Sequence, residues 1–247
     1  MNKWLLVLIL AMLPAAAQAV EGAALPHVTI DVSDKSALQD GARTFVNYCM
    51  GCHGAKFQRY ERVADDLGIS HDMMLEKLVF TAAKIGDHMT TAMRPDDAKA
   101  WFGAAPPDLT LVARVRGTDW LYGYLRSFYE DPTRPWGVNN SVFPNVGMPN
   151  VLESLQGRQV KACSEGAEGE KGSADPSCDR LTLVPDSGSL SVEQFDDKIR
   201  NLVTFLAYSA NPVKLQSQRI GTYVLLYLAL LFIFAYLLKR EYWKDVH

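Results

Sequence analysis

The sequence predicts a mainly α-helical protein with one domain followed by a single transmembrane helix. Apolar residues recur at helical spacing in several stretches between residues 20 and 212, whereas strand signals are sparse. Residues 220–238 contain no charged side chain, and these roughly 19 residues would form ~28 Å of helix, close to the thickness of a bilayer core. The intervening stretch of about 200 residues is enough for one globular domain with a sizeable core.

The N-terminus has the pattern of a secretory signal peptide. Lys3 precedes an apolar run over residues 4–13, and the small residues Ala17-Gln18-Ala19 form an A-x-A cleavage pattern. The apolar run is too short to cross about 30 Å of hydrocarbon. We therefore expect residues 1–19 to be removed and residues 20–212 to fold outside the cytoplasmic membrane.

Helical periodicity and capping residues predict the elements of this domain in order. We expect helices over residues 36–48, 70–85, 96–102, 119–129 and 191–211. Ser70 is a candidate N-cap for the second helix, and Ser191 with Gln194 forms a capping box that opens the last one. Residues 132–149 are dense in Pro, Gly and Asn, which predicts a long loop.

The run Cys49-Met50-Gly51-Cys52-His53 is a C-x-x-C-H motif, the attachment site of a c-type haem. The two cysteines would form thioethers with the porphyrin, and His53 would ligate the iron. A zinc site would need a second Cys/His pair at similar spacing, and only Cys163 and Cys178 remain. The motif occurs once, so we expect one haem c and one domain.

The sixth iron ligand decides between electron transfer and chemistry at an open iron. The candidates in the domain are Met73, Met74, Met89, Met93, Met148, His71 and His88. Met148 differs from the others because it lies between Pro144 and Pro149, in an extended loop that can hold a thioether rigidly. It also precedes the last helix of the domain.

This order of an N-terminal helix, C-x-x-C-H, a proline-rich middle, a methionine loop and a C-terminal helix resembles the cytochromes c with His/Met-ligated haem. Residues 43–48 before the motif, 106–114 in the middle and 147–149 in the loop, followed by one C-terminal anchor, resemble more closely the cytochrome c1 family of bacterial type. That family supplies the haem subunit of the quinol:cytochrome c reductase, or cytochrome bc1 complex. The resemblance covers most of the chain after residue 19.

The resemblance implies a role for each site residue. Met148 would be the sixth ligand, Arg114 would meet a haem propionate, and Pro107 would back the haem. The protein would not be an enzyme by itself; it would take one electron from a Rieske iron-sulfur protein and pass it to a cytochrome c, with cytochrome b as a further partner of the proton-translocating complex. Two alternatives stay open: a free-standing anchored cytochrome, and a haem enzyme or gas sensor with an open sixth position.

Cys163 and Cys178 bracket a polar, acidic stretch, and in an exported domain they are most simply a disulfide that closes it. Zinc or redox-switch interpretations lack accompanying ligands. Glu165, Glu168 and Glu170 in this stretch are either a solvated loop or a surface that steers a basic cytochrome c.

The C-terminal sequence predicts orientation. After a linker at 213–219 and the span at 220–238, Lys239, Arg240 and Lys244 place the tail, residues 239–247, in the cytoplasm by the positive-inside rule. We therefore expect a single-pass protein of a bacterial inner membrane with its haem domain in the periplasm. A formal net charge of −3 and the lack of a basic run elsewhere give no indication of nucleic acid as a partner.

Overall fold

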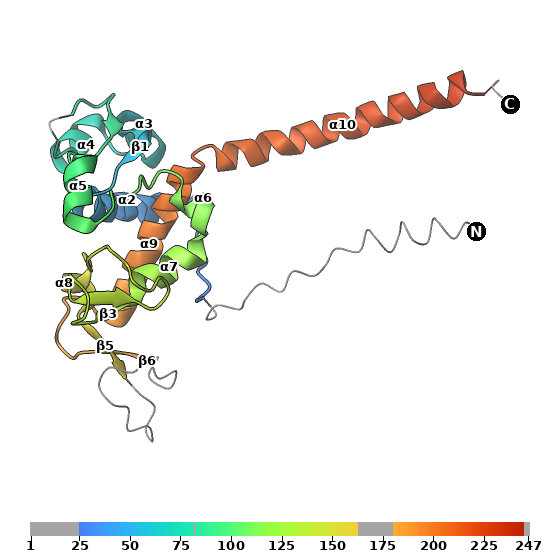
Figure 1. Cartoon of the computed structure of the whole chain (residues 1–247). Coiled ribbons are helices and arrows are strands. Elements are labelled where there is room, and N and C mark those ends of the chain that lie inside the picture. The colour runs from blue at the N-terminus through green and yellow to red at the C-terminus, as the bar shows by residue number, and fades with distance from the viewer. Residues whose placement is uncertain (1–24, 82, 163–179, 245–247) are drawn as a thin grey trace, which may run out of the picture.

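The computed structural model describes residues 25–81, 83–162 and 180–244 of the chain. Figure 1 shows a helical domain from which one long helix extends. The predicted fold class is confirmed: helices dominate the described residues, and the strands among them form three two-stranded antiparallel ladders.

The domain is built on the contact between α2 (Lys35–Thr44) and α9 (Val192–Ala210). Helix α9 begins with the predicted capping box, since Ser191 and Gln194 bond to each other's backbone N–H. Apolar side chains of both helices are buried between them, and the rings of Phe45 and Phe205 lie 5.6 Å apart. Segments more than 150 residues apart in the sequence therefore share one core.

A polar contact fixes how these two helices are aligned. Asp40 on α2 accepts hydrogen bonds from Lys198 Nζ at 2.8 Å and from Asn201 Nδ2 at 3.0 Å, both on α9. Gly41 follows directly and lies against the backbone carbonyl of Asn201. The absence of a side chain at Gly41 lets the two backbones approach this closely.

The remaining helices of the domain surround this pair (Figure 1). They are α3 (Tyr60–Leu67), α4 (His71–Leu78), α5 (Pro95–Phe102), α6 (Val112–Arg116), α7 (Thr118–Arg126) and α8 (Glu153–Gln156), with a π-helical turn η1 (Phe45–Cys49) after α2. Helix α4 starts at the predicted N-cap Ser70 but ends at Leu78, well before residue 85. Helix α7 ends earlier than expected because the chain enters a strand at Phe128.

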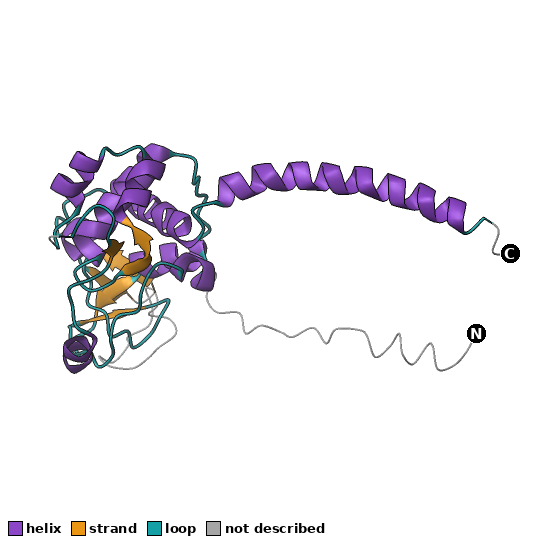
Figure 2. Cartoon of the chain, turned by 90° about the horizontal axis from the view of Figure 1, so that it is seen from above, coloured by secondary structure: helices purple, strands orange, loops and turns teal. Residues whose placement is uncertain are grey.

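The strands are short and were not predicted. They pair as β1 (Ala55–Arg59) with β2 (His88–Met89), β3 (Phe128–Glu130) with β4 (Val138–Asn140), and β5 (Gln159–Ala162) with β6 (Arg180–Leu183). Figure 2 shows these short strands and no separate sheet layer, and in Figure 1 β5 and β6 lie at the lower end of the domain. In the second ladder Phe128 pairs with Asn140, so the chain after β4 returns to the end of α7.

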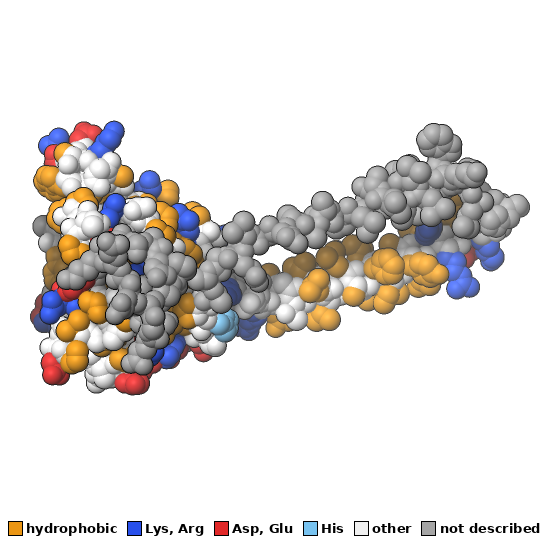
Figure 3. Space-filling model, turned by 60° about the horizontal axis from the view of Figure 1, so that its bottom comes forward, with side chains coloured by type: hydrophobic (Ala, Val, Ile, Leu, Met, Phe, Trp, Pro, Cys, Tyr) orange, Lys and Arg blue, Asp and Glu red, His pale blue; other side chains and the backbone are white. Residues whose placement is uncertain are grey.

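Helix α10 (Lys214–Tyr242) is the described helix that is long and apolar enough to cross a membrane. It has 29 residues, or about 44 Å of helix, against about 30 Å of hydrocarbon. None of its residues is buried, and hydrophobic side chains cover it up to a cluster of Lys and Arg at its far end (Figure 3). The expected linker at 213–219 is helical from Lys214 onward, so one continuous helix extends from the edge of the domain to Tyr242.

Some predictions lie outside the described residues. These are the signal peptide at 1–19, the pair Cys163 and Cys178, and the last residues of the tail, 245–247. The ladder of β5 and β6 ends with Ala162 opposite Arg180, so the described chain on either side of that insertion is held together. The disulfide stays a prediction.

The helix contact leads to a stability prediction for Gly41→Ala. The new Cβ would overlap the carbonyl of Asn201 and lie 2.8 Å from Cβ of Phe205, so the helices must separate. Overpacking typically costs about 1–3 kcal/mol of stability, and we expect a clash with the backbone to cost an amount at the upper end of this range. This cost exceeds the gain of about 1 kcal/mol that alanine brings in helix propensity. We expect a melting temperature several degrees lower for the haem-loaded protein in detergent, measured by circular dichroism.

Gly86→Ala is the matched control, because the nearest atom to its Cβ would be Glu61 Oε2 at 3.9 Å, an ordinary contact. Equal melting temperatures for the two variants would show that the packing of α2 against α9 does not depend on the close approach at Gly41.

Candidate functional site

The C-x-x-C-H motif lies where α2 ends. The π-helical turn η1 carries the chain to Cys49, whose carbonyl then accepts hydrogen bonds from the backbone N–H of Cys52 at 3.1 Å and of His53 at 2.8 Å. These bonds continue the turn past the end of the helix. As a result the side chains of Cys49, Cys52 and His53 all line one cavity.

This cavity has a volume of about 370 Å³ and is mostly apolar. Helices α6, α7 and α9, the end of α5 and the loops before α6 and α8 supply its walls. These include Phe102, Trp120, Tyr124, Phe143, Leu202 and Leu206. Its size lies within the range of about 300–1,000 Å³ found for ligand pockets. Two thiols, an imidazole and a thioether in an apolar, aromatic cavity fit a covalently attached porphyrin.

A hydrogen bond from Nδ1 orients the imidazole ring of His53. Its Nδ1 lies 2.7 Å from the backbone carbonyl of Pro107, which can only accept, so Nδ1 carries the proton. That tautomer leaves Nε2 free as a metal ligand, the usual arrangement for a ligating histidine. Burial lowers the pKa of His53, which favours the neutral imidazole that ligates.

Backbone contacts hold Pro107 in this position. The N–H of Leu109 donates to the carbonyl of Gly54 at 2.8 Å, and Asp108 Oδ2 accepts from the N–H of Lys56 at 2.7 Å. The proline-rich segment is therefore fastened along the chain that follows the motif. Pro107 lines the cavity, and its carbonyl orients His53, a contact that the sequence did not indicate.

Cys49 is a buried thiol. Burial, and next the charge of neighbouring Cys52, raise the pKa of Cys49 to about 12. Among the described residues there is no group of three or more His, Cys, Asp or Glu side chains that could hold a metal ion. The described residues thus offer no partner ligands for a zinc interpretation of Cys49 and Cys52.

Met148 enters the same cavity on a loop that two buried asparagines shape. Asn140 Oδ1 accepts from the N–H of Val142 at 2.9 Å and of Phe143 at 3.0 Å. Asn139 Oδ1 accepts from the N–H of Asn145 at 2.8 Å. The loop is therefore held by side-chain amides at the end of β4 rather than by a regular element.

An arginine completes the support of this loop. Arg134 donates from one terminal nitrogen to the carbonyl of Asn145 at 3.0 Å, just before the Gly147-Met148 step. Asn145 has a positive φ of 62°, which asparagine tolerates better than most residues. The sulfur of Met148 is thus presented by a backbone with a defined shape.

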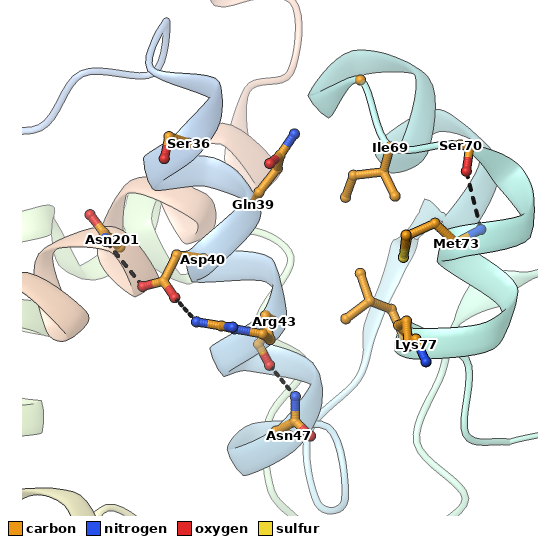
Figure 4. A pocket seen from close by; sticks show the side chains of 12 residues that line it. Ser36, Gln39, Asp40, Arg43, Asn47, Ile69, Ser70, Met73, Lys77 and Asn201 are labelled. Atoms are coloured by element: carbon orange, nitrogen blue, oxygen red, sulfur yellow. Dashed lines mark hydrogen bonds and ion pairs between the residues drawn. The ribbon is translucent and has the colours of Figure 1, made fainter.

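Of the seven ligand candidates, Met148 alone lines the cavity that holds the motif. Met73 lies instead in a separate groove of about 930 Å³ between α2 and α4, where Figure 4 shows it near Ile69 and Lys77. Met74 and Met89 are buried in the core. His71 bonds to Asp65 at 2.9 Å, and His88 is exposed on β2.

The structure does not bring Arg114 to the cavity. Both arginines of α6 are exposed, but Arg116 alone lines the cavity, with its guanidinium carbon 4.9 Å from the Trp120 ring centre. Residues two apart on a helix point about 200° apart, because each residue turns the helix by about 100°. The sequence therefore indicated this segment, but it did not show which of its two arginines, Arg114 or Arg116, faces the cavity.

Aromatic side chains of α7 form part of the cavity wall. The helix expected over residues 119–129 carries an aromatic stripe, and Trp120 and Tyr124 from it pack together, with 4.9 Å between the centres of their stacked rings. Both also face the cavity, and Phe143 joins them from the methionine loop. A stripe of this kind carries no signal that separates a core face from a cofactor face.

A helical domain that encloses one cavity lined by a C-x-x-C-H motif and a loop methionine, and that continues into an apolar helix, is a membrane-anchored c-type cytochrome. Comparison with known proteins identifies the kind. The model of the Cytochrome C1 family matches residues 27–246. The chain belongs to the cytochrome c1 family.

Individual relatives agree with this. The chain is 50% identical to cytochrome c1 of Allochromatium vinosum, with all of both chains covered. It is 27% identical to cytochrome c1 of Rhodospirillum rubrum over 86% of this chain and 83% of that one. It is also 40% identical to a protein of Nitrosomonas europaea named ammonia monooxygenase gamma subunit, over 100% and 99% of the two chains.

Family membership implies a covalently bound c-type haem and a function in electron transport. The apolar helix α10 is compatible with a single-pass membrane anchor.

Proposed function

We propose that this protein is the haem subunit of a quinol:cytochrome c reductase, with one haem attached through Cys49 and Cys52 and ligated by His53 and Met148. It would accept electrons from a Rieske iron-sulfur protein and pass them to a cytochrome c. The observation that carries the proposal is that His53 and Met148, far apart in sequence, line the same apolar cavity. The haem supplies the one-electron couple.

The chain's own residues favour electron transfer over substrate chemistry. The Pro107 carbonyl holds the imidazole of His53 in one tautomer, and Asn139 and Asn140 hold the backbone of the loop that carries Met148. His53 and Met148 would leave no open position on the haem iron, and a thioether ligand favours the reduced state. Fixed ligands before and after electron transfer also limit reorganisation, so an enzyme or sensor with an open position fits less well.

Arg116 takes the part first expected of Arg114. It is the arginine that lines the cavity, and its guanidinium lies against the rings of Trp120 and Phe143. A cation held there can pair with a carboxylate at the edge of the porphyrin and favours the ferrous state, which carries one positive charge less.

The remaining features complete the proposal. The domain would lie in the periplasm of a bacterium, anchored by α10, with the tail from Lys239 in the cytoplasm and cytochrome b beside the anchor. The disulfide between Cys163 and Cys178 would close the acidic insertion after export.

The two arginines of α6 make a matched pair for mutagenesis. We expect Arg116→Gln to shift the ferric–ferrous equilibrium about threefold or more toward ferric, a fall of about 30 mV or more for one electron. Arg114→Gln should leave the potential unchanged, because its side chain lies on the other side of the helix and does not line the cavity. Redox titration of both purified variants is the measurement, and a reversed result would return the propionate role to Arg114.

The place in a complex is tested by gentle detergent purification of the tagged chain from its native membranes. The proposal predicts that b-type haem and an iron-sulfur centre co-purify, and that the preparation reduces cytochrome c with quinol in an inhibitor-sensitive way. A lone c-type haem without this activity would contradict it.

That second result would favour a free-standing anchored cytochrome that serves another oxidase or reductase. The relative from Nitrosomonas europaea is named for a different enzyme, so the proteins that co-purify should also be identified by mass spectrometry.

A further inference from the structure

Tyr124 on α7 makes the one polar contact that is recorded for the sulfur of Met148 in the described residues. Its hydroxyl donates a hydrogen bond to Met148 Sδ across 3.3 Å. A thioether sulfur has two lone pairs and is a weak acceptor. One lone pair can therefore face a metal while the other accepts the tyrosine proton.

The position of the hydroxyl is fixed by the surrounding rings. Tyr124 stacks on Trp120 with 4.9 Å between ring centres and 8° between planes. Phe128 meets it edge-on at 5.3 Å. These ring contacts hold the hydroxyl against the sulfur of Met148.

The backbone of the same residue is tied to the methionine loop. The carbonyl of Tyr124 accepts a hydrogen bond from Asn140 Nδ2 at 2.8 Å. The other atom of that amide, Oδ1, accepts from the N–H groups of Val142 and Phe143. Tyr124 thus contacts the loop at two points, through its hydroxyl at the sulfur and through its carbonyl at the start of the loop.

We propose that Tyr124 is a positioning residue that raises the reduction potential of the haem through its hydrogen bond to the ligand Met148. The proposal rests on the proposed function, since it requires Met148 as the sixth ligand. A proton donated to the sulfur withdraws electron density from it, which weakens its donation to iron. Ferric iron depends more on that donation than ferrous iron does, so the bond favours the reduced state; hydrogen bonding around a ligand is a known means of tuning such sites.

The test compares two tyrosines of α7 in the full-length, haem-loaded protein. Tyr124→Phe removes the hydroxyl and keeps the stacked ring. Tyr122→Phe is the matched control, because Tyr122 is buried on the same helix but does not line the cavity and lies against Arg126, 4.7 Å from ring centre to guanidinium carbon. The readouts are redox titration and the long-wavelength sulfur-to-ferric-iron band.

We expect Tyr124→Phe to keep this band and to shift the ferric–ferrous equilibrium roughly threefold toward ferric, about 30 mV for one electron. Tyr122→Phe should match the unmodified protein in both readouts. An unchanged potential in Tyr124→Phe, or an equal shift in both variants, would overturn the proposal. If the unmodified protein lacks the sulfur-to-iron band, Met148 ligation itself is refuted and this inference falls with it.

A second measurement needs no variant and covers the case in which Tyr124→Phe fails to mature. In the ferrous, diamagnetic protein, the hydroxyl proton of Tyr124 should be protected from exchange and give a nuclear Overhauser effect to the methyl group of Met148. A rapidly exchanging hydroxyl proton, with no such contact, would overturn the proposal.

Discussion

The close approach of α2 and α9 is the contact on which the rest of this structure depends. The haem motif begins where α2 ends, and α9 forms part of the cavity wall through Leu202 and Leu206. If the two helices moved apart, the cysteines and that wall would separate. Glycine at position 41 and the bonds of Asp40 to α9 therefore determine the geometry of a site that neither residue touches.

The two sides of the site are built in different ways, and the difference follows from their chemistry. His53 has a strong polar group, so a single carbonyl orients it. Met148 has a weakly polar thioether, and its position must come from the backbone that carries it. Asn139, Asn140 and Arg134 provide this through hydrogen bonds that replace regular secondary structure.

Residues with strong local signals were predicted correctly from the sequence, and those whose role depends on the tertiary fold were not. The capping box at Ser191 and the apolar stretch at 220–238 are patterns of neighbouring residues, and each predicted a helix that is present in the structure. The short strands have too few residues for an alternating pattern, and residues 214–219 are mostly polar yet form the first turns of α10. Which arginine faces the cavity depends on how α6 is rotated, which a five-residue helix does not reveal in sequence.

The central claim is that one loop methionine supplies the sixth ligand, and the ferric absorption spectrum tests it most directly. Met148→Ala should lose the sulfur-to-iron band and gain a high-spin spectrum that an added imidazole reverses. Met73→Ala, in the groove between α2 and α4, should leave the spectrum unchanged. An unchanged spectrum in Met148→Ala would contradict the account and favour another ligand or an open position.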